Sequence, residues 1–242
     1  MQHVISRLRP RLKILFSSEG RFLLALLVAS ACVWGFIALA GIVGAESHLE
    51  LEEAWMRALR DPADPARPAG PWWLADLARD VSALGGATVV VLLSMLAAVF
   101  LLLRGRWRRV LLLVATIGGG YGLSSLLKDL FARERPDVVP HLLEVHSASF
   151  PSGHSLSSSV VYLTIGVFLA QAAPRKREKL FFIAAAFALT ALIGASRVFL
   201  GVHYPTDVLA GWCAGTAWAI ACGLVATWLR RWKPRLSSQE TK

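Results

Sequence analysis

Six long stretches without a lysine, arginine, aspartate or glutamate dominate this 242-residue chain. Apolar stretches of about 17–25 residues match the thickness of a bilayer core when they are helical. A buried core helix of a soluble protein could explain one such stretch but not six. The chain is also 55% hydrophobic, which is more than an ordinary soluble domain carries. The stretches cover residues 22–45, 81–103, 110–127, 145–174, 180–196 and 208–229.

We therefore predict an all-α polytopic membrane protein, a bundle of six transmembrane helices in a single domain over residues 1–242. The first apolar stretch could instead be a signal peptide, because a basic segment precedes it. It is longer than a typical signal-peptide core, which favours a retained helix. The expected spans are residues 22–45, 81–103, 110–131, 153–173, 180–197 and 205–229.

The net charge of +10 raises the possibility of a nucleic-acid partner, but its distribution argues against one. Four clusters hold 18 of the 26 lysines and arginines. They lie before the first stretch, between the second and third, between the fourth and fifth, and after the sixth. Six alternating helices place all four on one side, which is the positive-inside pattern of a cytoplasmic face. We expect a bacterial inner (plasma) membrane protein with both termini in the cytoplasm and no nucleic-acid partner.

The first loop on the opposite side, residues 46–80, predicts one or two short helices at the membrane interface. In "LELEEAWMRALR" the apolar Leu51, Trp55 and Leu59 recur four residues apart, as on one face of a helix. The segment "DPADPARPAGP" is a proline-rich break, and the tryptophan pair 72–73 is typical of interfacial anchors. Anchoring is the favoured role of this loop, and a gate for substrate is the alternative.

Small residues inside the apolar stretches predict how the helices pack. Gly118 and Gly122, and likewise Gly211 and Gly215, are spaced four apart, which lets two helices approach closely. We assign both pairs to contacts within the bundle, with homodimerisation as the alternative, so the oligomeric state stays open. The three cysteines fall inside apolar stretches and indicate packing residues.

Polar and ionisable side chains gather at the ends of three stretches, all on the non-cytoplasmic side. Ionisable groups at membrane depth are costly and therefore indicate a functional site. Three of these groups are cations, against one expected carboxylate partner. The candidate site residues are Lys128, Arg135, Ser152, Gly153, His154, Arg197, His203 and Asp207.

These residue types suit an anion that carries oxygen atoms. Arginine forks match phosphate oxygens, and lysine adds a point charge. Pro151 favours the start of a helix, Gly153 allows close approach to the backbone, and free N–H groups at a helix N-terminus bind anions. We therefore interpret "SFPSGHS" at residues 149–155 as the anion-binding start of a helix.

The two histidines could take two different catalytic roles, nucleophile and general acid. Asp207 lies four residues after His203, about one helical turn, where its carboxylate can hold one ring nitrogen and leave the other as a nucleophile. One histidine would attack phosphorus and the other, His154, would protonate the departing oxygen. The same residues could form a metal site of two histidines and one carboxylate, but the three nearby cations disfavour it. We expect no metal and no cofactor.

Three motifs in this order resemble those of the type 2 phosphatidic acid phosphatase (PAP2) superfamily: "KDLFARERP", "PSGH" and "SRVFLGVHYPTD", at residues 128–136, 151–154 and 196–207. The resemblance implies that His203 is the catalytic nucleophile and forms a phosphohistidine, that Asp207 orients it, and that His154 is the catalytic acid. It also implies phosphate binding by Lys128, Arg135, Ser152, Gly153 and Arg197, without a metal.

We thus expect an integral-membrane phosphatase that acts on a lipid phosphate at the periplasmic or exterior face. Phosphatidate, phosphatidylglycerophosphate, a polyprenyl diphosphate and the phosphorylated lipid of an endotoxin remain open as substrates. A lipid phosphotransferase would use the same site, and a non-catalytic lipid-binding membrane protein is a further alternative. A vanadium-dependent haloperoxidase shares the anion site, but six apolar stretches count against such a soluble enzyme.

Overall fold

The computed structural model describes residues 18–45, 49–145 and 147–236. Within them, five helices are long and apolar enough to cross a membrane, and two shorter helices form a sixth span when they are taken together. The predicted all-α membrane bundle is therefore confirmed. The five long helices are α2 (Ser18–Gly44), α6 (Trp107–Phe131), α7 (Gly153–Ala172), α8 (Lys176–Phe199) and α9 (Pro205–Leu236).

The second predicted span is broken rather than straight. Helix α4 (Trp73–Ala83) and helix α5 (Ala87–Leu103) are bent by 47° at a short break. The expected span of residues 81–103 combined the last turn of α4 with α5. The break contains Gly85 and Gly86, and glycine is unfavourable in a helix interior.

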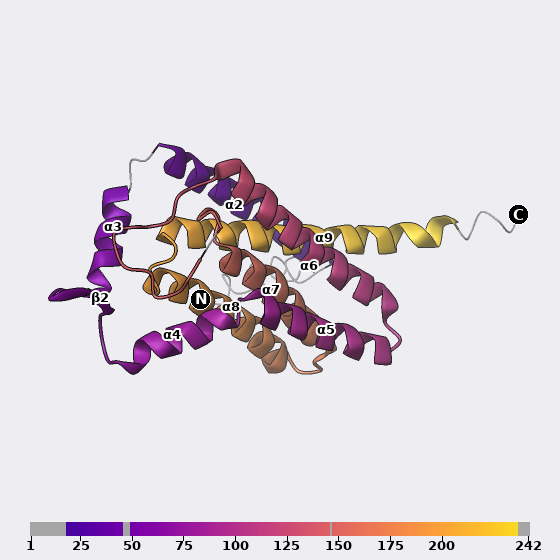
Figure 1. Cartoon of the computed structure of the whole chain (residues 1–242). Coiled ribbons are helices and arrows are strands. Elements are labelled where there is room, and N and C mark those ends of the chain that lie inside the picture. Colours follow the sequence, from indigo (N-terminus) through magenta and orange to yellow (C-terminus); the bar gives the residue numbers. More distant parts are fainter. Residues whose placement is uncertain (1–17, 46–48, 146, 237–242) are drawn as a thin grey trace, which may run out of the picture.

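The first loop folds into more structure than the sequence indicated. Helix α3 (Leu49–Ala58) is followed by an antiparallel hairpin of β1 (Arg60–Asp61) and β2 (Asp64–Pro68), where we expected only a proline-rich break. Figure 1 shows α3, the hairpin and α4 together at one end of the bundle, with the far end of α9 projecting from the other.

Helix α3 has one exposed face and one face that packs against the protein. Leu51 and Trp55 are exposed, as the interfacial prediction requires, whereas Glu52 and Met56 are buried on the opposite side. Met56 packs with Val139 of a site loop. The helix therefore docks onto the protein as well as presenting an apolar face outward.

Helix α7 lies at the centre of the bundle, where it packs against α6, α8 and α9. The approach to α9 is close because of Gly211 and Gly215. A Cβ atom at these positions would lie 2.7 Å from the Ser152 carbonyl oxygen and 2.5 Å from the Leu156 carbonyl oxygen. This glycine pair packs as predicted.

The other glycine pair was assigned to the wrong face of its helix. A Cβ atom at Gly118 or Gly122 would meet nothing within 4 Å among the described residues. The neighbouring Gly119 and Gly120 make the contacts instead, against Trp218 and Val160. A spacing of four marks one helix face, but tertiary packing decides which face is turned inward.

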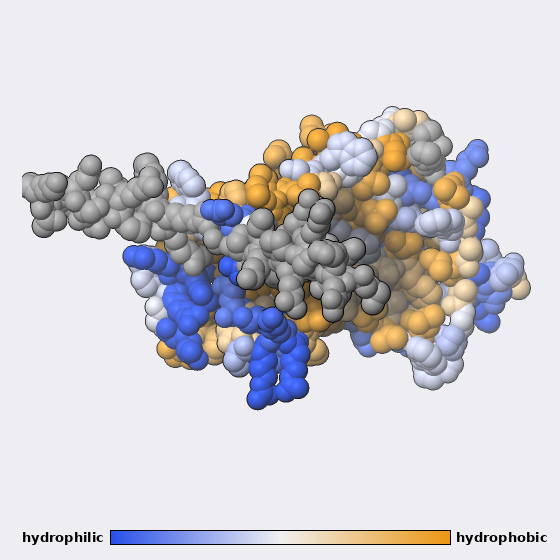
Figure 2. Space-filling model, turned by 180° about the vertical axis from the view of Figure 1, so that it is seen from behind, coloured by the Kyte–Doolittle hydropathy of each residue, from blue (hydrophilic) through white to orange (hydrophobic). Residues whose placement is uncertain are grey.

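On the face seen in Figure 2, apolar side chains cover the middle of the bundle between two more hydrophilic ends. Large apolar side chains on its surface include Trp34, Leu96 and Phe181. Water would disfavour so wide an apolar surface, whereas lipid chains match it. The protein is therefore an integral membrane protein. Part of the basic clusters at the two ends of the sequence lies outside the described residues, namely Arg7, Arg9, Arg11, Lys13 and Lys242.

Candidate active site

The start of α7 is built by a capped turn fixed to α9. Ser152 is the N-cap residue, and its Oγ accepts hydrogen bonds from the N–H and hydroxyl groups of Ser155 at 3.4 and 3.0 Å. The Ser152 N–H donates to the Asp207 carbonyl oxygen at 2.9 Å. Fully buried Phe150 packs edge to face against Phe131, with ring centroids 4.8 Å apart. The motif "PSGH" is thus held against the first turn of α9.

His203 and Asp207 lie together in the buried interior of this end. Nδ1 of His203 is 3.4 Å from Oδ2 of Asp207 and 3.3 Å from the hydroxyl oxygen of Ser149. That hydroxyl donates to Oδ2 at 2.5 Å, and the Tyr204 N–H donates to the same oxygen at 2.9 Å. The carboxylate therefore holds the histidine both directly and through Ser149.

The surroundings of the His203 ring indicate its tautomer. Nε2 lies 3.4 Å from an Arg135 guanidinium nitrogen, which can only donate a hydrogen bond. Acceptors surround Nδ1, so the proton belongs on Nδ1 and the lone pair on Nε2. Burial lowers the pKa of His203 to about 4, and Arg135 and Arg197 act in the same direction against Asp207. The ring is therefore neutral at neutral pH, with a lone pair on Nε2.

The three predicted cations converge near this histidine, and none forms an ion pair with a described residue. Lys128 donates to the Ala148 carbonyl oxygen. Arg135 donates to the carbonyl oxygens of Ser147 at 2.7 Å and Val202 at 2.6 Å. Arg197 donates to the Ser82 hydroxyl at 2.8 Å. Their charge remains available to an anion.

Arg197 has a further donor directed at no acceptor. The residue is only 3% exposed, and its Nε–H has no hydrogen-bond partner among the described residues. Buried donors are normally paired, so such an atom calls for an explanation. A phosphate oxygen would satisfy it.

His154 lies against the break between α4 and α5. A Cβ atom at Gly85 would come within 3.3 Å of the His154 ring, and one at Gly86 within 3.8 Å of its Nε2. Ser157 and Tyr162 of α7 donate to the carbonyl oxygens of Gly85 and Leu84. The break thus leaves room for the His154 ring while its exposed carbonyls are bonded by α7.

His154 is also within electrostatic range of His203, Lys128, Arg135 and Arg197. Neither of its ring nitrogens has a hydrogen-bond partner in the part of the chain that the structure describes. The structure therefore brings all predicted site residues to one end of the bundle. Gly153 is the last of the predicted site residues, and a Cβ atom added to it would lie 3.4 Å from Cε of Lys128.

Sequence reasoning missed two charged residues beside Asp207. Arg133 donates to Oδ1 of Asp207 at 2.7 Å and to Oε2 of Glu52 at 3.0 Å. We expected Asp207 to be a partner of the phosphate-binding cations, but Arg133 is its cation. The partners lie 81 and 74 positions apart from Arg133, so no local pattern could reveal them.

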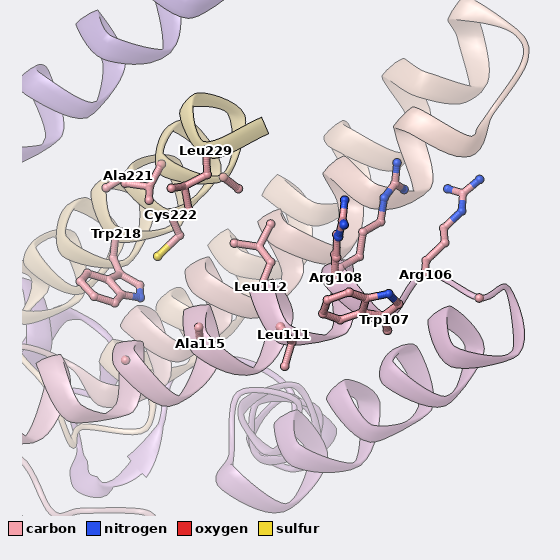
Figure 3. A pocket seen from close by; sticks show the side chains of 15 residues that line it. Arg106, Trp107, Arg108, Leu111, Leu112, Ala115, Trp218, Ala221, Cys222 and Leu229 are labelled. Atoms are coloured by element: carbon pink, nitrogen blue, oxygen red, sulfur yellow. The ribbon is translucent and has the colours of Figure 1, made fainter. Parts of the chain in front are cut away.

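No three His, Cys, Asp or Glu side chains among the described residues are grouped as a metal site would need. A cavity of about 1110 Å³ lies at the other end of the bundle, between α6 and α9. Its wall is mostly apolar, with Arg106 and Arg108 at its rim (Figure 3). It contains none of the site residues.

Known proteins are similar to this chain in sequence and in fold. Phosphatidylglycerophosphatase B of Bacillus subtilis is 36% identical over 146 residues, which are 59% of this chain and 70% of that protein. Lipid A 1-phosphatase of Rhizobium johnstonii is 38% identical over 115 residues, which are 43% of this chain and 42% of that protein.

The crystal structure of a transmembrane PAP2-type phosphatidylglycerolphosphate phosphatase from Bacillus subtilis superimposes with a TM-score of 0.72 and 27% identity. The superposition covers 84% of this chain and 98% of that one. The sequence profile of the PAP2 superfamily matches residues 109–232, which include both histidines and all three cations of the site. Because this profile matches half of the chain and the fold is shared, the chain belongs to the PAP2 superfamily and is a membrane phosphatase.

Proposed function

We propose that this protein hydrolyses the phosphate ester of a membrane lipid through a phosphohistidine at Nε2 of His203. One observation carries the proposal: three cations without a carboxylate partner surround a buried, neutral histidine whose other nitrogen is held by a paired carboxylate. A phosphate group would supply the missing negative charge next to the nucleophile.

Phosphate binding uses charged side chains from two helices and one loop, and backbone groups from a third helix. Lys128, Arg135 and Arg197 neutralise the phosphate oxygens, and the arginines add directed N–H groups. Gly153 contributes a backbone N–H of the α7 N-terminus, where an anion is favoured, and Ser152 caps this helix start. This places the phosphorus atom beside Nε2 of His203.

The chemistry then proceeds in two steps. Nε2 of His203 forms a bond to phosphorus while the bond from phosphorus to the lipid oxygen breaks, and His154 gives its proton to that oxygen. Water next attacks the phosphohistidine, His154 takes a proton from the water, and the phosphorus–nitrogen bond breaks to release phosphate. Asp207 holds the ring and stabilises its positive charge during both steps.

A phosphomonoester on a glycerophospholipid is the favoured substrate class, with phosphatidylglycerophosphate and phosphatidate as its members. The similarity to the Bacillus subtilis phosphatase, which covers 98% of that chain, supports this choice. Polyprenyl diphosphates and the phosphate of lipid A are the alternatives. Transfer of the phosphoryl group to an alcohol instead of water would use the same intermediate.

We place the site on the non-cytoplasmic face of a bacterial inner membrane, with both termini in the cytoplasm and one domain over the whole chain. The basic clusters of the sequence support this orientation. Ala63 of the hairpin loop and Arg177 at the start of α8 are both exposed. The other end of α8 lies beside the hairpin, because the Phe199 carbonyl oxygen accepts from Arg60, so the start of α8 lies at the far end of the bundle. After replacement of the native cysteines, Ala63→Cys should react with an impermeant thiol reagent on intact cells and Arg177→Cys should not.

The proposed function is tested with purified protein and a panel of lipid phosphates. Released phosphate is measured with and without a primary alcohol, and phosphoenzyme is trapped from a radiolabelled substrate by rapid quenching. We expect release from at least one glycerophospholipid monoester and an alkali-stable, acid-labile label that His203→Ala abolishes. Label that persists in His203→Ala, or release from no lipid phosphate, overturns the proposal.

A further inference from the structure

We infer that Arg133 is a positioning residue for Asp207, and that Glu52 of helix α3 holds Arg133 in place. The inference rests on the function proposed above, because it assigns a role around the same nucleophile. It extends the site to the first outer loop, which no motif of the family reaches.

Arg133 contacts Asp207 on the side away from His203. One guanidinium nitrogen donates to Oδ1 of Asp207 at 2.7 Å, while Oδ2 faces His203, Ser149 and the Tyr204 N–H. Oδ1 of Asp207 thus binds Arg133, whereas Oδ2 binds the groups around His203. With Oδ1 held by a charged donor, rotation that would turn Oδ2 away from His203 is opposed.

The backbone of Arg133 supports the opposite oxygen as well. Its carbonyl oxygen accepts the Ser149 N–H at 2.8 Å, and the Ser149 hydroxyl donates to Oδ2 of Asp207 at 2.5 Å. Arg133 therefore acts on Oδ1 with its side chain and on Oδ2 through Ser149. A purely stabilising surface ion pair would reach neither oxygen so directly.

Glu52 fixes the guanidinium from the other side. Oε2 of Glu52 accepts from Arg133 at 3.0 Å, and Oε1 accepts the Thr206 N–H in the first turn of α9 at 2.8 Å. The guanidinium also lies over the Tyr204 ring, 4.1 Å from its centroid, and donates to the Thr206 hydroxyl at 2.9 Å. Four groups from two segments thus define one geometry for Arg133.

Burial makes this arrangement costly to disturb. The side chains of Arg133 and Glu52 are 11% and 8% exposed, and that of Asp207 is fully buried. A buried ion pair adds little to stability but fixes geometry, since an unpaired charge is strongly unfavourable there. This cluster therefore suits orientation of Asp207 better than simple adhesion of α3.

Arg133 also limits how strongly Asp207 favours protonation of His203. The charged groups around His203 are Asp207, Arg135 and Arg197, with Lys128 and His154 nearby and Glu52 beyond Arg133. Removing the Arg133 charge leaves the Asp207 carboxylate with less compensation. Its attraction for a proton on His203 then rises, so the acidic limb of activity should move to higher pH.

The test compares Arg133→Gln, Arg133→Lys and Glu52→Gln with Glu53→Gln as the matched control. Glu53 is the next residue of the same helix, but it pairs with exposed Arg57 at 2.9 Å. Activity on a lipid phosphate in micelles is measured from pH 4 to 9, with thermal unfolding of each variant.

Arg133→Gln should lower kcat by roughly tenfold or more with KM within about threefold, and the acidic limb should rise by about one pH unit. Arg133→Lys should restore part of kcat, Glu52→Gln should lose severalfold, and Glu53→Gln should match the parent protein. If Arg133→Gln unfolds, the pH profiles of Arg133→Lys and Glu52→Gln decide.

Unchanged kcat and an unchanged acidic limb in Arg133→Gln overturn the inference, as does a loss confined to KM. Equal losses in Glu52→Gln and Glu53→Gln would show that α3 acts only through its general stability. The proposed function fails separately, through full activity of His203→Ala, and that result leaves the Arg133 contacts without a catalytic role.

Discussion

Nε2 of His203 lies 3.4 Å from the guanidinium of Arg135, so the nitrogen that we propose as the nucleophile faces a cation of the proposed phosphate site. This arginine thus disfavours a proton on Nε2. Burial acts in the same direction and lowers the pKa of His203 to about 4. Attack on phosphorus requires this neutral state.

The first prediction is therefore spectroscopic. With 15N-labelled histidine in detergent micelles, the His203 ring should stay neutral, with its proton on Nδ1, down to about pH 4–5. The spectrum of His203→Gln identifies the resonance. A His203 ring that titrates near its ordinary value of about 6.5 contradicts this description.

The same lowered pKa predicts how stability depends on pH. An unfolded histidine takes up a proton near pH 6.5, whereas folded His203 takes one up only near pH 4. The contribution to stability is thus present above pH 6.5 and is lost as pH falls toward 4. Thermal unfolding of the parent protein should weaken over that window more than that of His203→Gln.

Replacement of Arg197 by lysine tests the directed N–H groups of the site. Arg197→Lys keeps the charge but loses the Nε–H that has no partner and the 2.8 Å bond to Ser82. We expect kcat/KM to fall by about tenfold or more, which corresponds to about 1.4 kcal/mol. Ser82→Ala is the control, because it removes only the Ser82 bond and should lose less. Parent-like efficiency in Arg197→Lys would remove Arg197 from contact with phosphate.

The helix break tests whether room for His154 matters. Gly85→Ala would place a Cβ atom 2.5 Å from Ile193 and 3.3 Å from His154, so one of them must shift. We expect severalfold to tenfold lower kcat on a lipid phosphate. Gly118→Ala is the matched control, because its Cβ atom would meet nothing within 4 Å. Equal activities of the two variants would show that the break does not constrain the ring.

This break also marks the limit of what the sequence could predict. Charge-free length determines where helices can cross a membrane, so the helical bundle was predictable from the apolar stretches. No charged residue interrupts the stretch 81–103, so hydropathy alone predicts one continuous helix there. The break at Gly85 and Gly86 also depends on α7, whose side chains donate to the carbonyl oxygens of Leu84 and Gly85 and which only the assembled bundle brings there.

Motif spacing predicted that His203 and Asp207 lie together, because the pattern is local. His203 and Asp207 lie within one turn of each other, and a local carboxylate is visible in the sequence. The partners of Arg133 are far from it in the sequence: Glu52 precedes it by 81 residues and Asp207 follows it by 74. The sequence offered one signal: a second arginine, Arg133, in "KDLFARERP", to which the motif spacing assigns no role.

The last prediction separates the two histidines by the leaving group of the substrate. His203→Ala should abolish turnover of every substrate, because no phosphohistidine can form. If His154 protonates the departing oxygen, its loss should depend on how much that oxygen needs a proton. A lipid alkoxide leaves poorly, so His154→Ala should lose about 10²–10⁴-fold on a lipid phosphate.

A nitrophenolate is stable without a proton, so His154→Ala should retain far more activity in forming the phosphoenzyme from nitrophenyl phosphate. Stopped-flow measurement separates this step from hydrolysis. A rapid burst of nitrophenol followed by slow turnover would mean that His154 also activates water, as the second step requires. The inverted pattern, in which nitrophenyl phosphate rescues His203→Ala while His154→Ala is inactive on both substrates, would exchange the two roles. Because Nε2 of His203 lies beside Arg135 and both His154 nitrogens are without a partner among the described residues, we expect the first pattern.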